Sequence, residues 1–234
     1  MRAIRLSATG GPEVLDLVDL PDPEPGPGQL LVRQSAIGVN AVMRDITDGL
    51  AAQGFLAICP DLFWRIEPGV DITDRTEAEW KKAFALMNAF DASQGVKDIA
   101  ATLDHIRADP GCSGKAGAVG FCLGGQLAWL TATRTDADAA VSYYGVGIEG
   151  LIGESRTLRK PVMLHIAEAD GFVPPAAQAA IREGLADQPL AIIHTYPGRD
   201  HAFARLGGEH YHAADAALAG QRTLDFLRLN LGAA

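Results

Sequence analysis

Beyond residue 40, the hydrophobic positions follow two alternating patterns. Stretches with apolar residues three or four positions apart are typical of one face of a helix, and short, nearly continuous apolar runs are typical of buried strands. The pattern predicts helices over residues 42–50, 80–90, 96–106 and 213–229, and one that follows Cys122. It predicts strands over residues 55–59, 116–120, 139–144, 161–166 and 190–196. This alternation predicts successive βα units and a mainly parallel sheet.

The first forty residues follow a different pattern. Apolar alternation predicts strands over residues 2–8, 13–20 and 30–36, and the turn-rich run P-D-P-E-P-G-P-G precedes the third of them. We therefore divide the chain into an N-terminal segment, residues 1–40, and an α/β region, residues 41–234, and expect the two to form one compact domain.

Composition limits the classes of partner. The chain has 234 residues, 48% of them hydrophobic, which is enough for a sizeable core. A net charge of −9 argues against binding to nucleic acid or to an anionic membrane, because both need a basic surface. Three cysteines do not form a disulfide framework, and the opening residues lack the apolar core of a signal peptide. We expect a cytoplasmic protein that is a monomer or a weak homo-oligomer.

The run Gly120-Phe121-Cys122-Leu123-Gly124 has the spacing of a nucleophile elbow, with cysteine where serine is usual. Such a turn between strand and helix exposes the central side chain at the sheet edge. It also directs the Leu123 N–H towards negative charge that develops beside the sulfur. The simpler interpretation is that Cys122 is a small buried hydrophobic residue, as most unpaired cysteines are.

Two further residues favour catalysis. Asp170 follows the predicted strand 161–166, and His201 follows the predicted strand 190–196. A thiol nucleophile needs a base, and the base needs an orienting acid. The carboxyl ends of parallel strands meet at one edge, and the order nucleophile, acid, histidine is that of α/β-hydrolases. We therefore predict a catalytic triad of Cys122, His201 and Asp170.

Other histidines fit structural roles better. His165 and His194 lie within apolar strands and are expected to be core residues, while His105 lies on a helix. His210 and His212 beside Glu209 could ligate a metal, but no third cluster stands at ligand spacing. We expect no metal site there.

The run Gly145-Val146-Gly147-Ile148-Glu149-Gly150 imitates a dinucleotide-binding motif, with Asp170 about twenty residues further on. Little chain separates it from the next strand, so there is little room for the helix that should bind the pyrophosphate. Glu149 would add a repelling carboxylate. We interpret the run as a tight loop and expect no organic cofactor.

From about residue 38 onward, the chain resembles the dienelactone hydrolase (carboxymethylenebutenolidase) family. The resemblance is carried by G-V-N-A-V-M-R-D, C-P-D-L-F-W-R, G-F-C-L-G-G, Y-Y-G-V-G, D-G-F-V-P, H-A-F-A-R and R-T-L-D-F-L. It implies an α/β-hydrolase fold with helices on both faces of the sheet, and a Cys-His-Asp triad at Cys122, His201 and Asp170. It also implies hydrolysis of a lactone whose carboxylate is gripped by Arg205.

Residues 1 to about 40 instead resemble the start of a medium-chain quinone oxidoreductase, through M-R-A-I-R-L-S-A-T-G-G-P-E-V-L and P-G-P-G-Q-L-L-V-R-Q-S-A-I-G-V-N. The two resemblances meet at Gly38-Val39-Asn40. We therefore interpret the chain as a chimera in which a foreign segment supplies the N-terminal strands. A reductase activity is not transferred, because the cofactor domain of that family is absent.

Two departures from the hydrolase family concern the site. The family places a glutamate where this chain has Ser35, although the next residue, Ala36, could still supply a second oxyanion donor through its N–H. A second family arginine also has no counterpart, since the matching helix carries Lys81 and Lys82.

Together these features predict a cofactor-independent cysteine hydrolase that cleaves a small ester or lactone. The alternatives are a folded but impaired chimera and an NADPH-dependent reductase.

Overall fold

The computed structural model describes residues 2–6, 15–19, 30–34 and 38–232. Six strands form one sheet in which every pair of neighbours is parallel. Their order across the sheet is β4 (Leu56–Ile58), β3 (Leu30–Gln34), β5 (Ala116–Phe121), β6 (Ala139–Tyr143), β7 (Val162–Ala167) and β8 (Ala191–Tyr196). The predicted mainly parallel sheet is therefore confirmed. The strands β5, β6 and β7 are buried along their whole length, as expected for strands covered on both faces.

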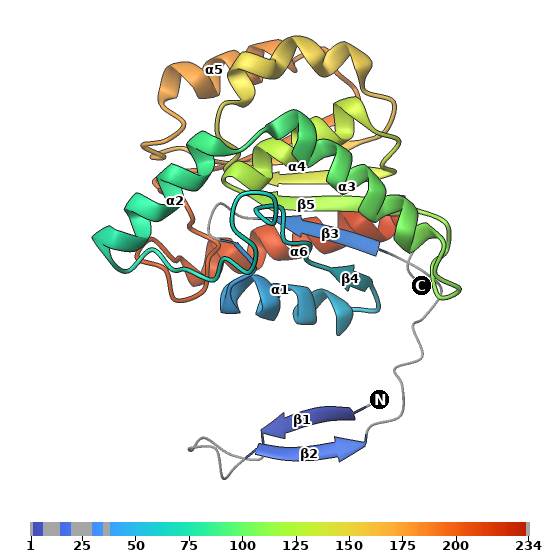
Figure 1. The fold of residues 1–234 in the computed structure, drawn as a ribbon. Helices are drawn as coiled ribbons and strands as arrows, with labels where there is room; N and C mark the ends of the chain where they lie inside the picture. Colours follow the sequence, from blue (N-terminus) through green and yellow to red (C-terminus); the bar gives the residue numbers. More distant parts are fainter. Residues whose placement is uncertain (1, 7–14, 20–29, 35–37, 233–234) are drawn as a thin grey trace.

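Helices cover both faces of this sheet (Figure 1). One face carries α3 (Ala92–Arg107) and α4 (Leu123–Arg134), and the other carries α1 (Ala41–Ala51) and α6 (Ala213–Leu231). The buried side chains accordingly form two clusters, one that includes α3 and α4 and one that includes α1 and α6. The predicted helices and strands are confirmed, with boundaries shifted by a few residues.

The helix α2 (Glu77–Ala89) lies beyond the carboxyl end of β4, where it borders the site described below. Its start has the capping box that the sequence T-E-A-E contains. Thr76 accepts a hydrogen bond from the Glu79 N–H, and the Glu79 carboxylate accepts one from the Thr76 hydroxyl. This cap fixes where the helix begins and therefore how its aromatic residues are aimed.

Two helical segments were not predicted. The helix α5 (Pro175–Gly184) follows β7, and a 3₁₀ helix, η2 (Ile148–Thr157), follows β6. The helix α5 is short and buries only Ala177, Gln178 and Ile181, so few large apolar residues mark it in the sequence.

The N-terminal strands divide between two sheets. The strands β1 (Arg2–Leu6) and β2 (Leu15–Asp19) pair only with each other, antiparallel, in a two-stranded sheet. The strand β3 instead lies inside the main sheet, where Leu30–Gln34 pairs with Ala116–Gly120 of β5. The third predicted strand therefore takes the place beside the elbow strand that a hydrolase site requires.

Candidate active site

The elbow predicted around Cys122 is present at the junction of β5 and α4. Cys122 has φ 58° and ψ −119°, a conformation that L-residues rarely adopt and that often marks a functional position. Its N–H donates to the Tyr143 carbonyl, which ties the turn to the neighbouring strand. Gly120 has no room for a side chain, because a Cβ there would lie 1.7 Å from the Gly124 carbonyl oxygen. The glycine frame of the motif is therefore a steric requirement of the turn.

The structure brings the three predicted catalytic residues together. His201 Nδ1 lies 2.8 Å from Asp170 Oδ2, and both side chains are buried. Cys122 lies close to His201 at the same pocket, and its sulfur is one of the groups that raise the pKa of the imidazole. Asp170 is itself held in place, because its Oδ1 accepts hydrogen bonds from the N–H groups of Phe172 and Val173 at 2.8 and 3.3 Å. The acid, the histidine and the sulfur thus lie in series, with a hydrogen bond between the acid and the histidine.

The electrostatics of this series favour a charged histidine. Burial alone lowers the pKa of His201, but its hydrogen bond to Asp170, the nearby Cys122 sulfur and the negative charges of both groups outweigh burial and raise the pKa to about 9. At neutral pH the imidazole is therefore held as an imidazolium between a carboxylate and a sulfur.

Of the two expected oxyanion donors, the structure describes only Leu123. Leu123 is the first residue of α4, so its N–H belongs to the first turn, where no preceding carbonyl of the helix can accept it. Ala36 and Ser35 lie outside the described residues, and their predicted roles stay predictions.

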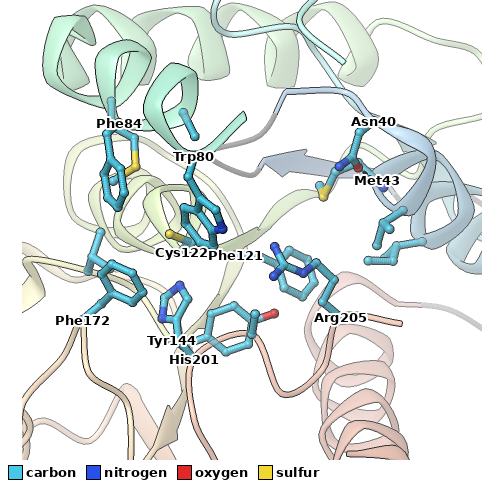
Figure 2. Close-up of a pocket in the computed structure, with 16 residues that line it drawn as sticks. Asn40, Met43, Trp80, Phe84, Phe121, Cys122, Tyr144, Phe172, His201 and Arg205 are labelled. Atoms are coloured by element: carbon cyan, nitrogen blue, oxygen red, sulfur yellow. Dashed lines mark hydrogen bonds between the residues drawn. The ribbon is translucent and has the colours of Figure 1, made fainter. Parts of the chain in front are cut away.

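The triad opens into a pocket whose walls are mainly apolar (Figure 2). Three aromatic residues form one wall. Trp80 and Phe84 stack one turn apart on α2, with ring centroids 5.6 Å apart, and Phe172 stacks against Trp80 at 6.3 Å. The Phe172 ring also lies 4.7 Å from the His201 ring. Asn40, Met43 and Arg205 lie across the pocket from Phe84 and Phe172.

Arg205 lines the pocket, as the resemblance implies, but its guanidinium is paired within the protein. Its Nη2 is bonded to the Asp74 carboxylate, from the loop before α2. The two lysines on α2 do not replace the missing arginine at the pocket, because Lys82 is bonded to Glu67 and Lys81 faces solvent.

Comparison with known proteins identifies the family. A model of the dienelactone hydrolase family matches residues 17–231, which is most of the chain. The chain belongs to the dienelactone hydrolase family. A protein of Azospirillum brasilense named "Putative carboxymethylenebutenolidase" is 49% identical over 216 residues, which cover 89% of each chain. A crystal structure titled "Putative Dienelactone Hydrolase", from Klebsiella pneumoniae, has a TM-score of 0.74 and 28% identity and covers 88% of each chain.

Membership of the dienelactone hydrolase family confirms the predicted α/β-hydrolase fold and makes the protein a hydrolase. It does not support the chimera. The family match begins at residue 17, and the carboxymethylenebutenolidase of Pseudomonas sp. strain P51, 32% identical over 225 residues, covers 96% of this chain and 94% of that protein. The family match and this alignment both extend into residues 1–40. The chimera interpretation rested on the resemblance of that segment to a quinone oxidoreductase, and neither match supports it.

The glycine-rich loop of this dienelactone hydrolase family member differs from a nucleotide site. The 3₁₀ helix η2 begins at Ile148, inside the motif, so the expectation of little room for a helix was too strict. However, Glu149 stands in its first turn, where a pyrophosphate would need positive charge. Gly147 has φ 72°, which fits the predicted tight loop.

The histidines near the C-terminus have a structural role. His212 caps α6, because its Nδ1 accepts a hydrogen bond from the Asp215 N–H at 3.3 Å. His210 lies 3.8 Å from Asp200. Among the described residues, no group of three or more His, Cys, Asp or Glu side chains is arranged to hold a metal ion. Within the same part of the chain, every helix is too short or too polar to span a bilayer.

His165 is a satisfied core histidine, as predicted. Its Nδ1 is bonded to the Tyr196 hydroxyl at 2.8 Å and its Nε2 to the Thr223 hydroxyl at 3.0 Å. Burial, followed by the nearby His194 and Arg222, lowers its pKa well below the ordinary value. The folded protein therefore holds His165 neutral under conditions in which the unfolded chain would protonate it.

This difference predicts an acid-sensitive stability. We expect the free energy of unfolding to fall by up to about 2 kcal/mol between pH 7 and pH 5, because below about pH 6.5 the unfolded state binds a proton that the folded His165 does not. His201, whose pKa is raised to about 9, opposes this fall by less than about 1 kcal/mol over the same window, because its folded form already holds the proton that its unfolded form gains. Urea unfolding at stepped pH measures the effect.

His165→Gln should reduce the dependence of the free energy of unfolding on pH. The control His105→Gln, at an exposed histidine, should leave that dependence unchanged. An unaltered pH dependence in His165→Gln would contradict this account.

Several residues of the site gave no usable signal in the sequence. Tyr144, whose ring lies 5.0 Å from that of His201, has φ 37°, and nothing in its strand indicates that strain. The site also includes Asp74 and Phe172, which lie in loops, and Trp80, which lies in the first turn of α2. Tertiary folding, and not a local pattern, brings these three side chains to the site. A capping box before Trp80 was the one indication that an aromatic helix begins beside the site.

Proposed function

We propose that the protein hydrolyses a small ester or lactone through covalent catalysis by Cys122. The observation that carries the proposal is the hydrogen-bonded pair of His201 and Asp170 beside Cys122, at the floor of a pocket. A nucleophile beside a base that is oriented by an acid is the arrangement that acyl transfer requires. Membership of the dienelactone hydrolase family supports the same chemistry.

In the first step, the Cys122 thiolate attacks the carbonyl carbon of the substrate. A carbon–sulfur bond forms, and the carbonyl oxygen becomes an oxyanion that the Leu123 N–H stabilises, with the Ala36 N–H proposed as second donor. The intermediate collapses, the bond to the leaving oxygen breaks, and His201 gives its proton to that oxygen. An acyl thioester on Cys122 remains.

In the second step, His201 accepts a proton from water, which attacks the thioester carbonyl. The carbon–sulfur bond breaks, the carboxylic acid leaves, and Cys122 and His201 return to their starting state. Asp170 orients His201 throughout and stabilises its charged form. The raised pKa of His201 supports this cycle, because an imidazolium beside the sulfur favours the reactive thiolate.

The pocket supports a small substrate with an apolar or aromatic part. Its walls carry Trp80, Phe84 and Phe172 on one side and Met43 on the other. The names of the relatives point to a butenolide, which is a lactone. A carboxylated enol-lactone, whose carboxylate would approach Arg205, is therefore one substrate to test, beside a neutral lactone of the same size. Ser35, in place of the family glutamate, is proposed to border the same site.

Trapping the acyl intermediate tests the proposal. When the protein is mixed with an activated aryl ester of a bulky acid and quenched in acid within seconds, we expect one acyl group per chain, on the peptide that holds Cys122. The measurement is the mass of the intact protein and of its peptides. Turnover without acylation of Cys122, or acylation of another residue, contradicts the mechanism. Absence of both turnover and acylation would instead favour the impaired alternative.

We also retain three proposals that rest on the sequence. They are a cytoplasmic location, a monomeric or weakly associating state, and one compact domain formed by residues 1–40 and 41–234. The odd and low number of cysteines, three in 234 residues, supports the first.

A further inference from the structure

The guanidinium of Arg205 is engaged before any substrate arrives. Asp74 and Arg205 are 131 positions apart in the sequence, and the bond between them joins the loop before α2 to the loop after β8. Both side chains are mostly buried, with exposed fractions of 15% for Asp74 and 16% for Arg205. A pair shielded from water in this way is stronger than an exposed ion pair, and removing one partner leaves a charge without compensation.

The surroundings of this pair are acidic. A side pocket next to His201 is lined by Asp74, Asp200 and Glu209, with Arg205 as its permanently charged cation among the described residues. An anion that approaches Arg205 from this side meets three carboxylates against two positive groups, the Arg205 guanidinium and the protonated His201. The electrostatic field in this side pocket therefore opposes the approach of a negatively charged substrate.

The guanidinium nevertheless keeps spare donor capacity. Its Nε is buried and has no hydrogen-bond partner among the described residues. Arg205 also lines the main pocket, together with Cys122 and His201 (Figure 2). If the Asp74 carboxylate were removed, an anion in the pocket could form the two parallel hydrogen bonds that a guanidinium offers to a carboxylate.

We propose that Asp74 determines substrate selectivity by occupying the anion-binding face of Arg205, so that the resting site favours neutral aryl esters and lactones over carboxylated ones. This inference deepens the proposed function and rests on it, because only a hydrolase has ester or lactone substrates between which to select. A carboxylated substrate can use Arg205 only by displacing Asp74, whereas a neutral substrate leaves the pair intact and contacts the aromatic wall.

A binding experiment tests the proposal without requiring turnover. The probes are 2-naphthoate and its neutral analogue 2-naphthamide, which share one aromatic body, and the measurement is Kd by calorimetry or by naphthalene fluorescence. We expect Asp74→Asn to bind 2-naphthoate at least about tenfold more tightly than the parent, with 2-naphthamide changed less than twofold. The double variant Asp74→Asn, Arg205→Gln should lose the gain.

The matched control is Asp71→Asn, which removes a carboxylate of the same loop. Asp71 pairs with Arg44, and neither residue lines the two pockets. It should change neither Kd. A second readout is the ratio of kcat/KM for 3- and 4-carboxyphenyl acetate to that for their methyl-capped, neutral counterparts, which should rise at least about tenfold in Asp74→Asn.

The outcomes separate this inference from the proposed function. A tenfold gain for 2-naphthoate in a protein that hydrolyses neither ester supports the role of Asp74 and overturns the proposed hydrolysis. No gain for 2-naphthoate, an equal gain in Asp71→Asn, or equal weakening of both probes in Asp74→Asn overturns the inference. The last of these would mean that Asp74 only holds its loop in place.

Discussion

Replacing Cys122 with alanine should lower ester hydrolysis at least about 10⁴-fold, because removal of the nucleophile from a triad leaves only the contributions of substrate binding and of the oxyanion donors. His201 would still be oriented by Asp170, yet it would have no sulfur to activate. The measurement is kcat/KM for an activated aryl ester, with the acyl-enzyme mass as an independent readout.

The chain offers a matched control in Cys112. It is also a free cysteine, but it lies in a turn outside the pocket. Cys112→Ala should keep the parent kcat/KM within about twofold, since surface changes away from a site are usually small. Both variants should retain the fold, and far-ultraviolet circular dichroism and thermal midpoint check this. Turnover by Cys122→Ala within tenfold of the parent would remove the cysteine from the mechanism.

Replacing Gly120 with alanine should destabilise the protein by more than about 4 kcal/mol or prevent folding, because the added methyl would collide with the backbone of the elbow. The Cβ would lie 1.7 Å from the Gly124 carbonyl oxygen and 2.9 Å from the Gly125 nitrogen. Both contacts are with backbone that the turn holds in place, so no side-chain movement can relieve them. Urea unfolding and soluble yield measure the effect.

Gly49→Ala is the matched control. Gly49 is exposed on α1, and a Cβ there would meet no atom within 4 Å. Alanine has the higher helix propensity, so this variant should gain about 0.5–1 kcal/mol of stability. If Gly120→Ala folds with the stability of the parent, the elbow is less crowded than the structure indicates, and the steric account of the motif fails.

Local patterns in the sequence were enough to predict much of the fold and the centre of the site. The strands around β5 are continuous apolar runs, and Cys122, Asp170 and His201 each follow such a run, so the rule that parallel strands share one functional edge placed them together. The same reasoning missed α5, because Ile181 is the one large hydrophobic residue among those that this helix buries.

The contacts that modify the site could not be predicted in this way. The pairing of Arg205 with Asp74 joins two loops without periodicity, and no local propensity encodes it. The resemblance predicted that Arg205 lines the site. It could not predict that the Arg205 guanidinium is already paired with a carboxylate of the protein. The chimera interpretation of residues 1–40 likewise finds no support in the family match, which begins at residue 17.

The aromatic wall lies on a different part of the chain from the nucleophile. Trp80 and Phe84 stand on consecutive turns of α2, a helix that does not contribute to the elbow, and Phe172 follows the acid of the triad. Natural or laboratory evolution can therefore change which acyl group fits by varying the α2 surface, without disturbing the strained turn at Cys122. Substitutions on α2 should therefore change substrate preference with little loss of folding stability. This makes the protein a suitable starting point for directed evolution.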